Sequence, residues 1–249
     1  MGGASRNEKR RKQEEAERRL AAAGIRVPQK RNRTPMIVVA VVIVVAVVVG
    51  GALLVARALG GDVEPTYTAK ADGAVVTAGT GPVVIDLYED YICPSCERFE
   101  ARYGSEVTTA LNEGKISLRI HTIAILDEQS NPAGYSTRAG NAALCAVSAG
   151  IFPRYHEKLF DEQPAEGSAG LSDDQLIAFG TELGAQGDFA ACVQGNTHVD
   201  AVAAETEKAT SDTALQTNGR FGTPTVAIGG KKIDLNDTSW LQKAIEGQP

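Results

Sequence analysis

The chain of 249 residues is long enough for one large domain with appendages, and its formal net charge of −6 is spread unevenly. Residues 1–35 hold eleven Lys and Arg against four Glu, a net charge of +7, which leaves −13 on residues 36–249. A basic arm is typical of nucleic-acid binding or of membrane orientation. This arm has no aromatic residues between its charges, so nucleic acid is not an expected partner, and a solvated cytoplasmic arm is the simpler interpretation.

Residues 36–56 form a run of 21 residues without a charge. A helix of that length spans a hydrocarbon core of roughly 30 Å. Four basic residues precede the run (Arg26, Lys30, Arg31 and Arg33) and only Arg57 follows it. The positive-inside rule then predicts a single-pass anchor with a cytoplasmic N-terminus and an extracytoplasmic domain. A cleaved signal peptide is the alternative, but its apolar core is normally about 7–15 residues and its charged region is short.

The rest of the chain is predicted to be one exported domain, residues 67–249, joined to the anchor by a linker at residues 57–66. A short edge strand is predicted at 74–77, a central strand at 83–88, a helix at 94–113 and a second core strand at 115–125. The sequence then becomes alanine-rich, with helices predicted at 136–149, 152–160, 172–183, 188–193 and 199–215. Strand patterns return at 225–228 and 231–233 around a Gly-Gly turn, and a helix follows at 238–246. This order predicts an α/β, thioredoxin-like fold with an α-helical subdomain inserted at about residues 130–217, preceded by one transmembrane helix.

The motif Cys93-Pro94-Ser95-Cys96 lies directly after the central strand and opens the following helix. Two cysteines at i and i+3 share one helix face, so their sulfurs can form a disulfide that opens and closes. Cys93 lies at the helix N-terminus, where unpaired N–H groups and the helix dipole favour a thiolate. Cys96, one turn further in, is the expected resolving thiol. Pro94 suits the first turn, and the Ser95 hydroxyl is able to donate a hydrogen bond toward the thiolate.

Two other interpretations of this motif are weaker. A structural disulfide here would add little constraint to the fold, because both cysteines lie in the first turn of the same helix. A zinc site would need a second C-x-x-C or a histidine pair. His121, His156 and His198 lack that spacing, so no metal is expected, and the histidines are interpreted as core or surface residues. All four cysteines lie in the exported part, and an even number in an oxidising compartment favours two disulfides.

Residues 87–99, Leu-Tyr-Glu-Asp-Tyr-Ile-Cys-Pro-Ser-Cys-Glu-Arg-Phe, resemble the active site of DsbA-like thiol:disulfide oxidoreductases of the thioredoxin superfamily. Gly222-Thr223-Pro224-Thr225 resembles the cis-proline loop of that family. The resemblance covers about residues 68–247 and is closest to membrane-anchored actinobacterial DsbA-like proteins. It implies that Thr223 and Pro224 face the C-x-x-C motif and offer backbone to an extended substrate. It also implies a second disulfide, Cys145–Cys192, in the helical block, with a second redox-active pair as the alternative.

One position departs from the pattern of related folds, which often carry a buried acid six residues before the first cysteine. That position is Leu87 here, and strand alternation turns the neighbouring Asp86 to the other face. Glu89 and Asp90 lie nearer the cysteines, and the sequence leaves open which of them takes the place of that buried acid.

The expected function is that of a membrane-tethered thiol:disulfide oxidoreductase that introduces disulfides into exported proteins without a cofactor. The resemblance implies reoxidation by a quinone-linked membrane partner of the VKOR or DsbB type. An extracytoplasmic reductase or isomerase uses the same site in the opposite direction and is the first alternative. A non-catalytic anchored binding module is the second.

Overall fold

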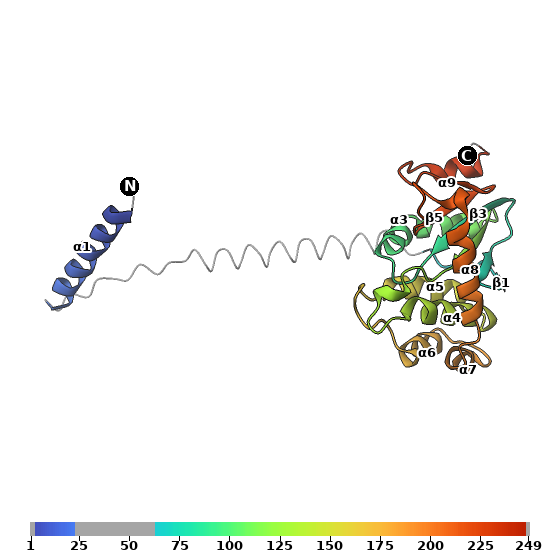
Figure 1. Ribbon diagram of the computed structural model, residues 1–249, viewed down its shortest axis with the longest axis horizontal. Helices are drawn as coiled ribbons and strands as arrows, with labels where there is room; N and C mark the ends of the chain where they lie inside the picture. The colour runs from blue at the N-terminus through green and yellow to red at the C-terminus, as the bar shows by residue number, and fades with distance from the viewer. Residues whose placement is uncertain (1–2, 23–62, 248–249) are drawn as a thin grey trace. The chain divides into compact units, whose positions relative to one another are not determined.

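A computed structural model describes residues 3–22 and 63–247 (Figure 1). The chain divides into two compact units, residues 1–61 and 62–249. In the first, helix α1 (Gly3–Ala22) carries i,i+4 ion pairs between Lys12 and Glu8 and between Arg10 and Glu14. The basic arm is therefore helical over much of its length.

The predicted membrane segment, residues 36–56, lies outside the described residues, as does most of the predicted linker at 57–66. Within 3–22 and 63–247, no helix combines the length and the apolar character that crossing a bilayer needs. The end of the linker is tied to the domain. Asn112 accepts a hydrogen bond from the Thr66 backbone N–H at 2.8 Å and donates one to the Glu64 carbonyl at 2.9 Å.

The second unit is built on a six-stranded sheet with the order β1-β2-β4-β3-β5-β6. The strands are β1 (Ala69–Asp72), β2 (Val75–Ala78), β3 (Val83–Glu89), β4 (Ile116–Thr122), β5 (Thr225–Ile228) and β6 (Lys231–Lys232). Only the central pair β3–β4 is parallel, and helix α3 (Pro94–Asn112) connects its two strands. Parallel strands need such a crossover, so the cysteine motif falls where the chain leaves the carboxyl end of β3.

Between β4 and β5 lies the predicted helical subdomain, and its presence is confirmed. It holds α4 (Tyr135–Ser148), α5 (Phe152–Asp161), α6 (Asp173–Glu182), α7 (Phe189–Gln194) and α8 (Val199–Ser211), with 3-10 turns at Asp127–Gln129 and Thr213–Leu215. Helix α4 contacts α5, α6, α7 and α8, so it forms the centre of the subdomain. A capping box opens α6, where Ser172 and Gln175 exchange hydrogen bonds. Helix α9 (Trp240–Ile245) closes the domain.

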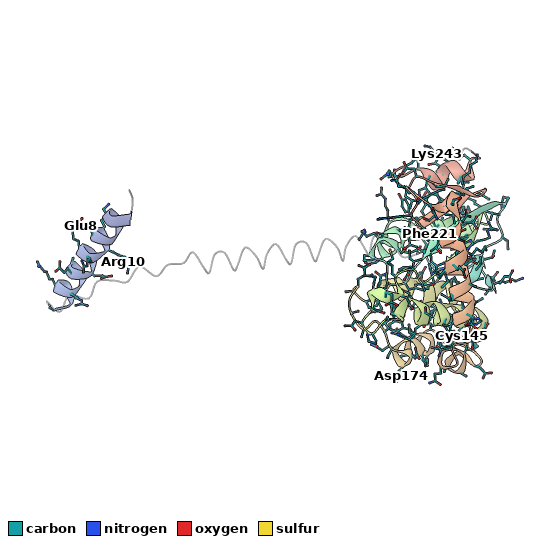
Figure 2. The ribbon with its side chains drawn as sticks, viewed as in Figure 1. Glu8, Arg10, Cys145, Asp174, Phe221 and Lys243 are labelled. Atoms are coloured by element: carbon teal, nitrogen blue, oxygen red, sulfur yellow. A yellow bond between two sulfur atoms is a disulfide. The ribbon has the colours of Figure 1, made fainter. Side chains whose placement is uncertain are left out.

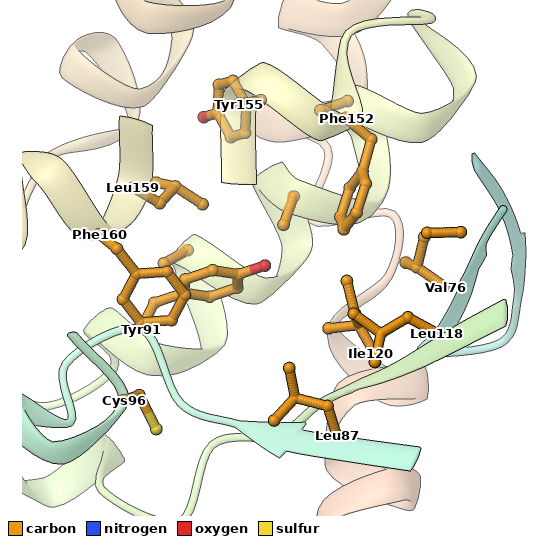
Figure 3. Close-up of a cluster of buried hydrophobic side chains, with 14 of the residues drawn as sticks. Val76, Leu87, Tyr91, Cys96, Leu118, Ile120, Phe152, Tyr155, Leu159 and Phe160 are labelled. Atoms are coloured by element: carbon orange, nitrogen blue, oxygen red, sulfur yellow. The ribbon is translucent and has the colours of Figure 1, made fainter. Parts of the chain in front are cut away.

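The two faces of the sheet differ in chemistry because successive side chains along a strand alternate. Leu87, Leu118 and Ile120 pack with Phe152, Tyr155 and Leu159 in the buried core, as Figure 3 shows. The opposite face carries Asp86, Arg119 and His121, which are linked by hydrogen bonds. The apolar face thus packs against helix α5 of the subdomain, and the polar face bonds to helix α8 through Glu205.

The prediction of an edge strand at 74–77 was wrong. The strand there, β2, pairs with β4 on one side and with β1 on the other, so β1 forms that edge. Residues Ala69–Asp72 are poor strand formers and mostly exposed, and their pairing with β2 is what makes them a strand. At the other edge the Gly-Gly turn is confirmed. Gly229 and Gly230 have φ of 58° and 76°, as a two-residue hairpin turn with positive φ at both positions requires.

Candidate active site

The turn between β3 and α3 presents the cysteine motif. Cys93 is the N-cap of α3 with extended backbone dihedrals, and Pro94 occupies the first helical turn, where its missing N–H is not needed. The buried carboxylate of Asp90 organises this turn. It accepts hydrogen bonds from the backbone N–H groups of Ile92 at 3.1 Å and Leu126 at 2.9 Å, and from the Ser136 hydroxyl at 2.6 Å. Burial nevertheless raises the pKa of Asp90 to about 6.

The two thiols differ in environment. Both cysteines are free, Cys93 is 5% exposed, and Cys96 is fully enclosed. In Figure 3, Cys96 lies at the edge of the buried cluster near Tyr91 and Phe160. Of the two sulfur-bearing residues, only Cys93 keeps any exposed surface.

The environments move the two pKa values apart. A hydrogen bond from the Cys96 thiol lowers the pKa of Cys93 to about 5. Burial opposes this shift, and the first backbone N–H groups of α3, those of Ser95 and Cys96, reinforce it. For Cys96, burial raises the pKa well above the ordinary value, and the charges of Glu89 and Cys93 add to the increase. This difference in pKa is the one that a nucleophilic Cys93 and a resolving Cys96 require, and those roles stay predictions.

The proline loop faces the first cysteine across a large distance in sequence. The Cys93 thiol donates a hydrogen bond to the Thr223 carbonyl oxygen at 3.4 Å, and the two residues are 130 positions apart. The Thr223–Pro224 peptide bond is cis. The Thr225 hydroxyl donates to the Gly222 carbonyl at 2.7 Å and closes the loop before β5. The structure therefore brings together all four residues predicted for this part of the site, Cys93, Cys96, Thr223 and Pro224.

Two polar residues, Ser95 inside the motif and Gln163 beside it, make hydrogen bonds at this turn. The Ser95 hydroxyl accepts a hydrogen bond from Arg98 at 2.8 Å, so its backbone N–H rather than its side chain acts on Cys93. Gln163, just after α5, donates to the Cys93 carbonyl at 3.2 Å. Gln163 was not predicted, because it lies 70 residues from Cys93 and no motif marks it.

The second cysteine pair is separate from this site. Cys145 of α4 and Cys192 of α7 form a disulfide with a Cα–Cα distance of 5.9 Å, as the family resemblance implied. In Figure 2, Cys145 and Phe221 of the proline loop are labelled at well-separated places in the domain. The pair links two helices of the inserted subdomain.

Leu87 and Asp86 lie on opposite faces of the sheet, as strand alternation predicts. Leu87 is a core residue, and Asp86 on the opposite face bonds to Arg119 and His121. Glu89, two residues after Leu87 on the same face, is 1% exposed. Burial raises the pKa of Glu89 well above its usual value, and the charges of Glu100 and Cys93 add to this.

A reactive dithiol at a helix start, opposed by a cis-proline loop on a thioredoxin-like sheet, defines a thiol–disulfide exchange site. The family model described as Thioredoxin matches residues 72–247, and the chain belongs to that family. The predicted identification as a DsbA-like thiol:disulfide oxidoreductase is confirmed at this level.

Solved structures of thiol–disulfide oxidoreductases are similar to this chain. DsbA of Mycobacterium tuberculosis in its oxidised form is 28% identical, with a TM-score of 0.59 and coverage of 73% of this chain and 91% of that one. The disulfide oxidoreductase DsbG of the same organism is 27% identical, with a TM-score of 0.58 and coverage of 76% and 89%. MdbA of Corynebacterium diphtheriae shares the fold, with a TM-score of 0.63 at 21% identity over 73% and 94%.

The curated relatives include serine/threonine-protein kinase PknE of Mycobacterium tuberculosis. PknE is 30% identical over 180 residues, which cover 70% of this chain and 31% of that protein. The chain therefore spans about a third of the length of the curated relatives it matches.

Proposed function

We propose that this protein is a membrane-tethered oxidase that transfers its Cys93–Cys96 disulfide to exported proteins. A substrate thiolate attacks the Cys93 sulfur and displaces Cys96 as a thiolate. The second substrate thiol then attacks the mixed disulfide, which releases the substrate disulfide and leaves the enzyme with two thiols. An extended substrate pairs with the backbone at Thr223, beside the sulfur it reacts with.

The difference in pKa between the two thiols is the observation that supports an oxidase rather than a reductase. A pKa of about 5 for Cys93 lies between the values of about 7 for thioredoxin and about 3.5 for DsbA. A stabilised thiolate favours the reduced enzyme, which makes the enzyme's disulfide a stronger oxidant.

Each turnover leaves the enzyme reduced, so the cycle needs an electron acceptor. We propose a quinone-linked membrane oxidoreductase of the VKOR or DsbB type. Two sequence features support a membrane location, the uncharged run at residues 36–56 and the basic residues before it. The cytoplasmic arm and the extracytoplasmic domain follow from that orientation. In cells expressing the full chain, the protein should fractionate with membranes, and external protease should remove the domain after residue 62 but leave the arm intact.

The reduction potential of the Cys93–Cys96 pair tests the direction. The full chain is equilibrated in glutathione buffers of graded ratio, and the fraction reduced is read by thiol alkylation and mass. We expect a potential well above the thioredoxin value of about −270 mV. A value near or below it would make the domain a reductase. A Cys145→Ala/Cys192→Ala variant serves as the matched control and should give the same potential.

A further inference from the structure

A second group of ligating side chains lies in the interior beside the dithiol. Glu89 at the end of β3, Glu100 of α3 and His156 of α5 each place one ligand atom within 4.8 Å of the others. The His156 Nε2 atom lies 3.5 Å from a Glu89 carboxylate oxygen and 3.9 Å from a Glu100 carboxylate oxygen. Three elements of the fold thus converge on one point.

Glu89 is the unusual member of the group. Its side chain is 1% exposed, no hydrogen bond of good geometry reaches either carboxylate oxygen from the described residues, and its neighbour Glu100 is a second carboxyl group that disfavours its charge. An unsatisfied buried carboxyl costs free energy, and buried polar groups in native proteins are nearly always satisfied. The carboxyl group nevertheless faces His156 and Glu100. A bound cation between these three side chains would account for both the burial and the direction of the Glu89 carboxyl group.

The orientation of His156 fits the same interpretation. Its Nδ1 atom lies 3.0 Å from the Tyr91 hydroxyl, and its ring stacks on Phe152 with centroids 5.4 Å apart. The ring is thereby fixed with Nε2 toward the two carboxylates. A histidine that ligates a metal through one nitrogen usually bonds through the other to a protein group, which Tyr91 provides here.

We propose that Glu89, Glu100 and His156 form a binding site for a divalent zinc ion. In a tetrahedral zinc site with bonds of about 2.0–2.1 Å, neighbouring ligand atoms are roughly 3.4 Å apart. The two distances from His156 Nε2 are close to that spacing, so small side-chain movements suffice. One histidine and two carboxylates form a ligand set that zinc accepts, and they leave a fourth position open. Glu100, 18% exposed, is the side from which the ion enters.

This site is distinct from the cysteine motif. The ligands come from two carboxylates and an imidazole, and no thiol belongs to the set.

Cobalt(II) is the spectroscopic probe of choice, and the full chain carrying Cys93→Ser and Cys96→Ser is the protein to titrate, since thiolates then cannot bind the metal. We expect one cobalt ion per chain with visible bands of a four-coordinate ion, displaced by zinc. His156→Gln and Glu100→Gln in the same background should each weaken binding by at least about tenfold. His198→Gln should leave binding unchanged, because the thiols near His198 are locked in the Cys145–Cys192 disulfide.

Two results would overturn the proposal. The first is the lack of saturable cobalt uptake by the serine variant, and the second is uptake that survives both ligand substitutions. Circular dichroism checks that each variant is folded. Should His156→Gln unfold, Glu100→Gln decides, because Glu100 is the most exposed of the three ligands. A melting temperature of the serine variant that rises with added zinc provides an independent reading, since a ligand bound only by the folded state stabilises it.

Discussion

The Cys93 thiol has a hydrogen bond from Cys96 and the first N–H groups of α3 around it, and its pKa is lowered to about 5. The thiolate is therefore the main form at neutral pH. Alkylation of the reduced enzyme by iodoacetamide should become about tenfold faster per pH unit up to pH 5 and level off above about pH 6. Quenched samples followed by mass spectrometry give the rates. Cys96, fully enclosed, should stay unmodified, and a midpoint near 9 for Cys93 would contradict the assignment.

The division of roles between the thiols predicts what each substitution does. Cys96→Ser should trap substrates as mixed disulfides on Cys93, because the thiol that resolves the complex is missing. Non-reducing electrophoresis should then show slow-migrating complexes that disappear on reduction. Cys93→Ser/Cys96→Ser is the matched control and should show none. Complexes that persist in this control would place the reactive thiol elsewhere.

At the scale of elements, His121 links the sheet to helix α8. It bonds to Asp86 at 3.0 Å and to Glu205 at 2.7 Å, and it stacks on Tyr88 with ring centroids 4.0 Å apart. Tyr88 in turn meets Phe221 of the proline loop edge-on at 5.8 Å. The histidine on β4 thus supports both α8 and the loop that carries Thr223.

We expect His121→Ala to lower the free energy of unfolding by about 3 kcal/mol, since it leaves two buried carboxylates without their shared partner. Denaturant unfolding of the full chain measures the loss. His198→Ala, at a half-buried position beside the disulfide, is the control and should cost about 0.5 kcal/mol. Equal losses for the two variants would mean that the His121 link does not hold the elements together.

The same link predicts a pH dependence. Burial lowers the pKa of His121, but the hydrogen bonds to Asp86 and Glu205 outweigh it and raise the net value above 6.5. The stability it contributes is complete below pH 6.5 and is lost as the pH rises through the raised value. The hydrogen bond to His121 lowers the pKa of Glu205. Burial raises the pKa of Asp86, but its hydrogen bonds to His121 and Arg119 outweigh burial and lower the net value. The stability that these two carboxylates contribute is therefore lost in acid, below about pH 4. Unfolding measured from pH 5 to 9 should show the alkaline loss in the wild type and not in His121→Ala.

The sequence allowed prediction of those elements whose signals are local. Cys93 and Pro94 mark the helix start, Gly229 and Gly230 the hairpin, and Ser172 and Gln175 the start of α6. Strand β1 escaped prediction because its residues do not favour a strand and only pairing makes them one. Two features depend on tertiary packing, and no periodic pattern in the sequence predicts them. They are the Glu89–Glu100–His156 group and the contact of Gln163 with Cys93.

For the whole molecule, the Cys145–Cys192 disulfide closes a loop of 47 residues inside the inserted subdomain. In the chain-entropy model this stabilises the fold by about 4 kcal/mol. Cys145→Ala/Cys192→Ala should therefore lower the melting temperature of the full chain and leave the exchange rate of Cys93 and Cys96 unchanged at temperatures where the variant is folded. Calorimetry and an insulin-reduction assay measure the two effects. Loss of turnover with an unchanged melting temperature would instead make this pair an electron relay.

The 130 positions between Cys93 and Thr223 also set an order in time. A ribosome that makes the chain completes the cysteine motif long before the loop that faces it, and the whole helical subdomain is made in between. A nascent chain therefore carries two thiols that cannot yet have their finished surroundings. A nascent chain that has not yet reached Thr223 therefore has the motif without the loop that faces it.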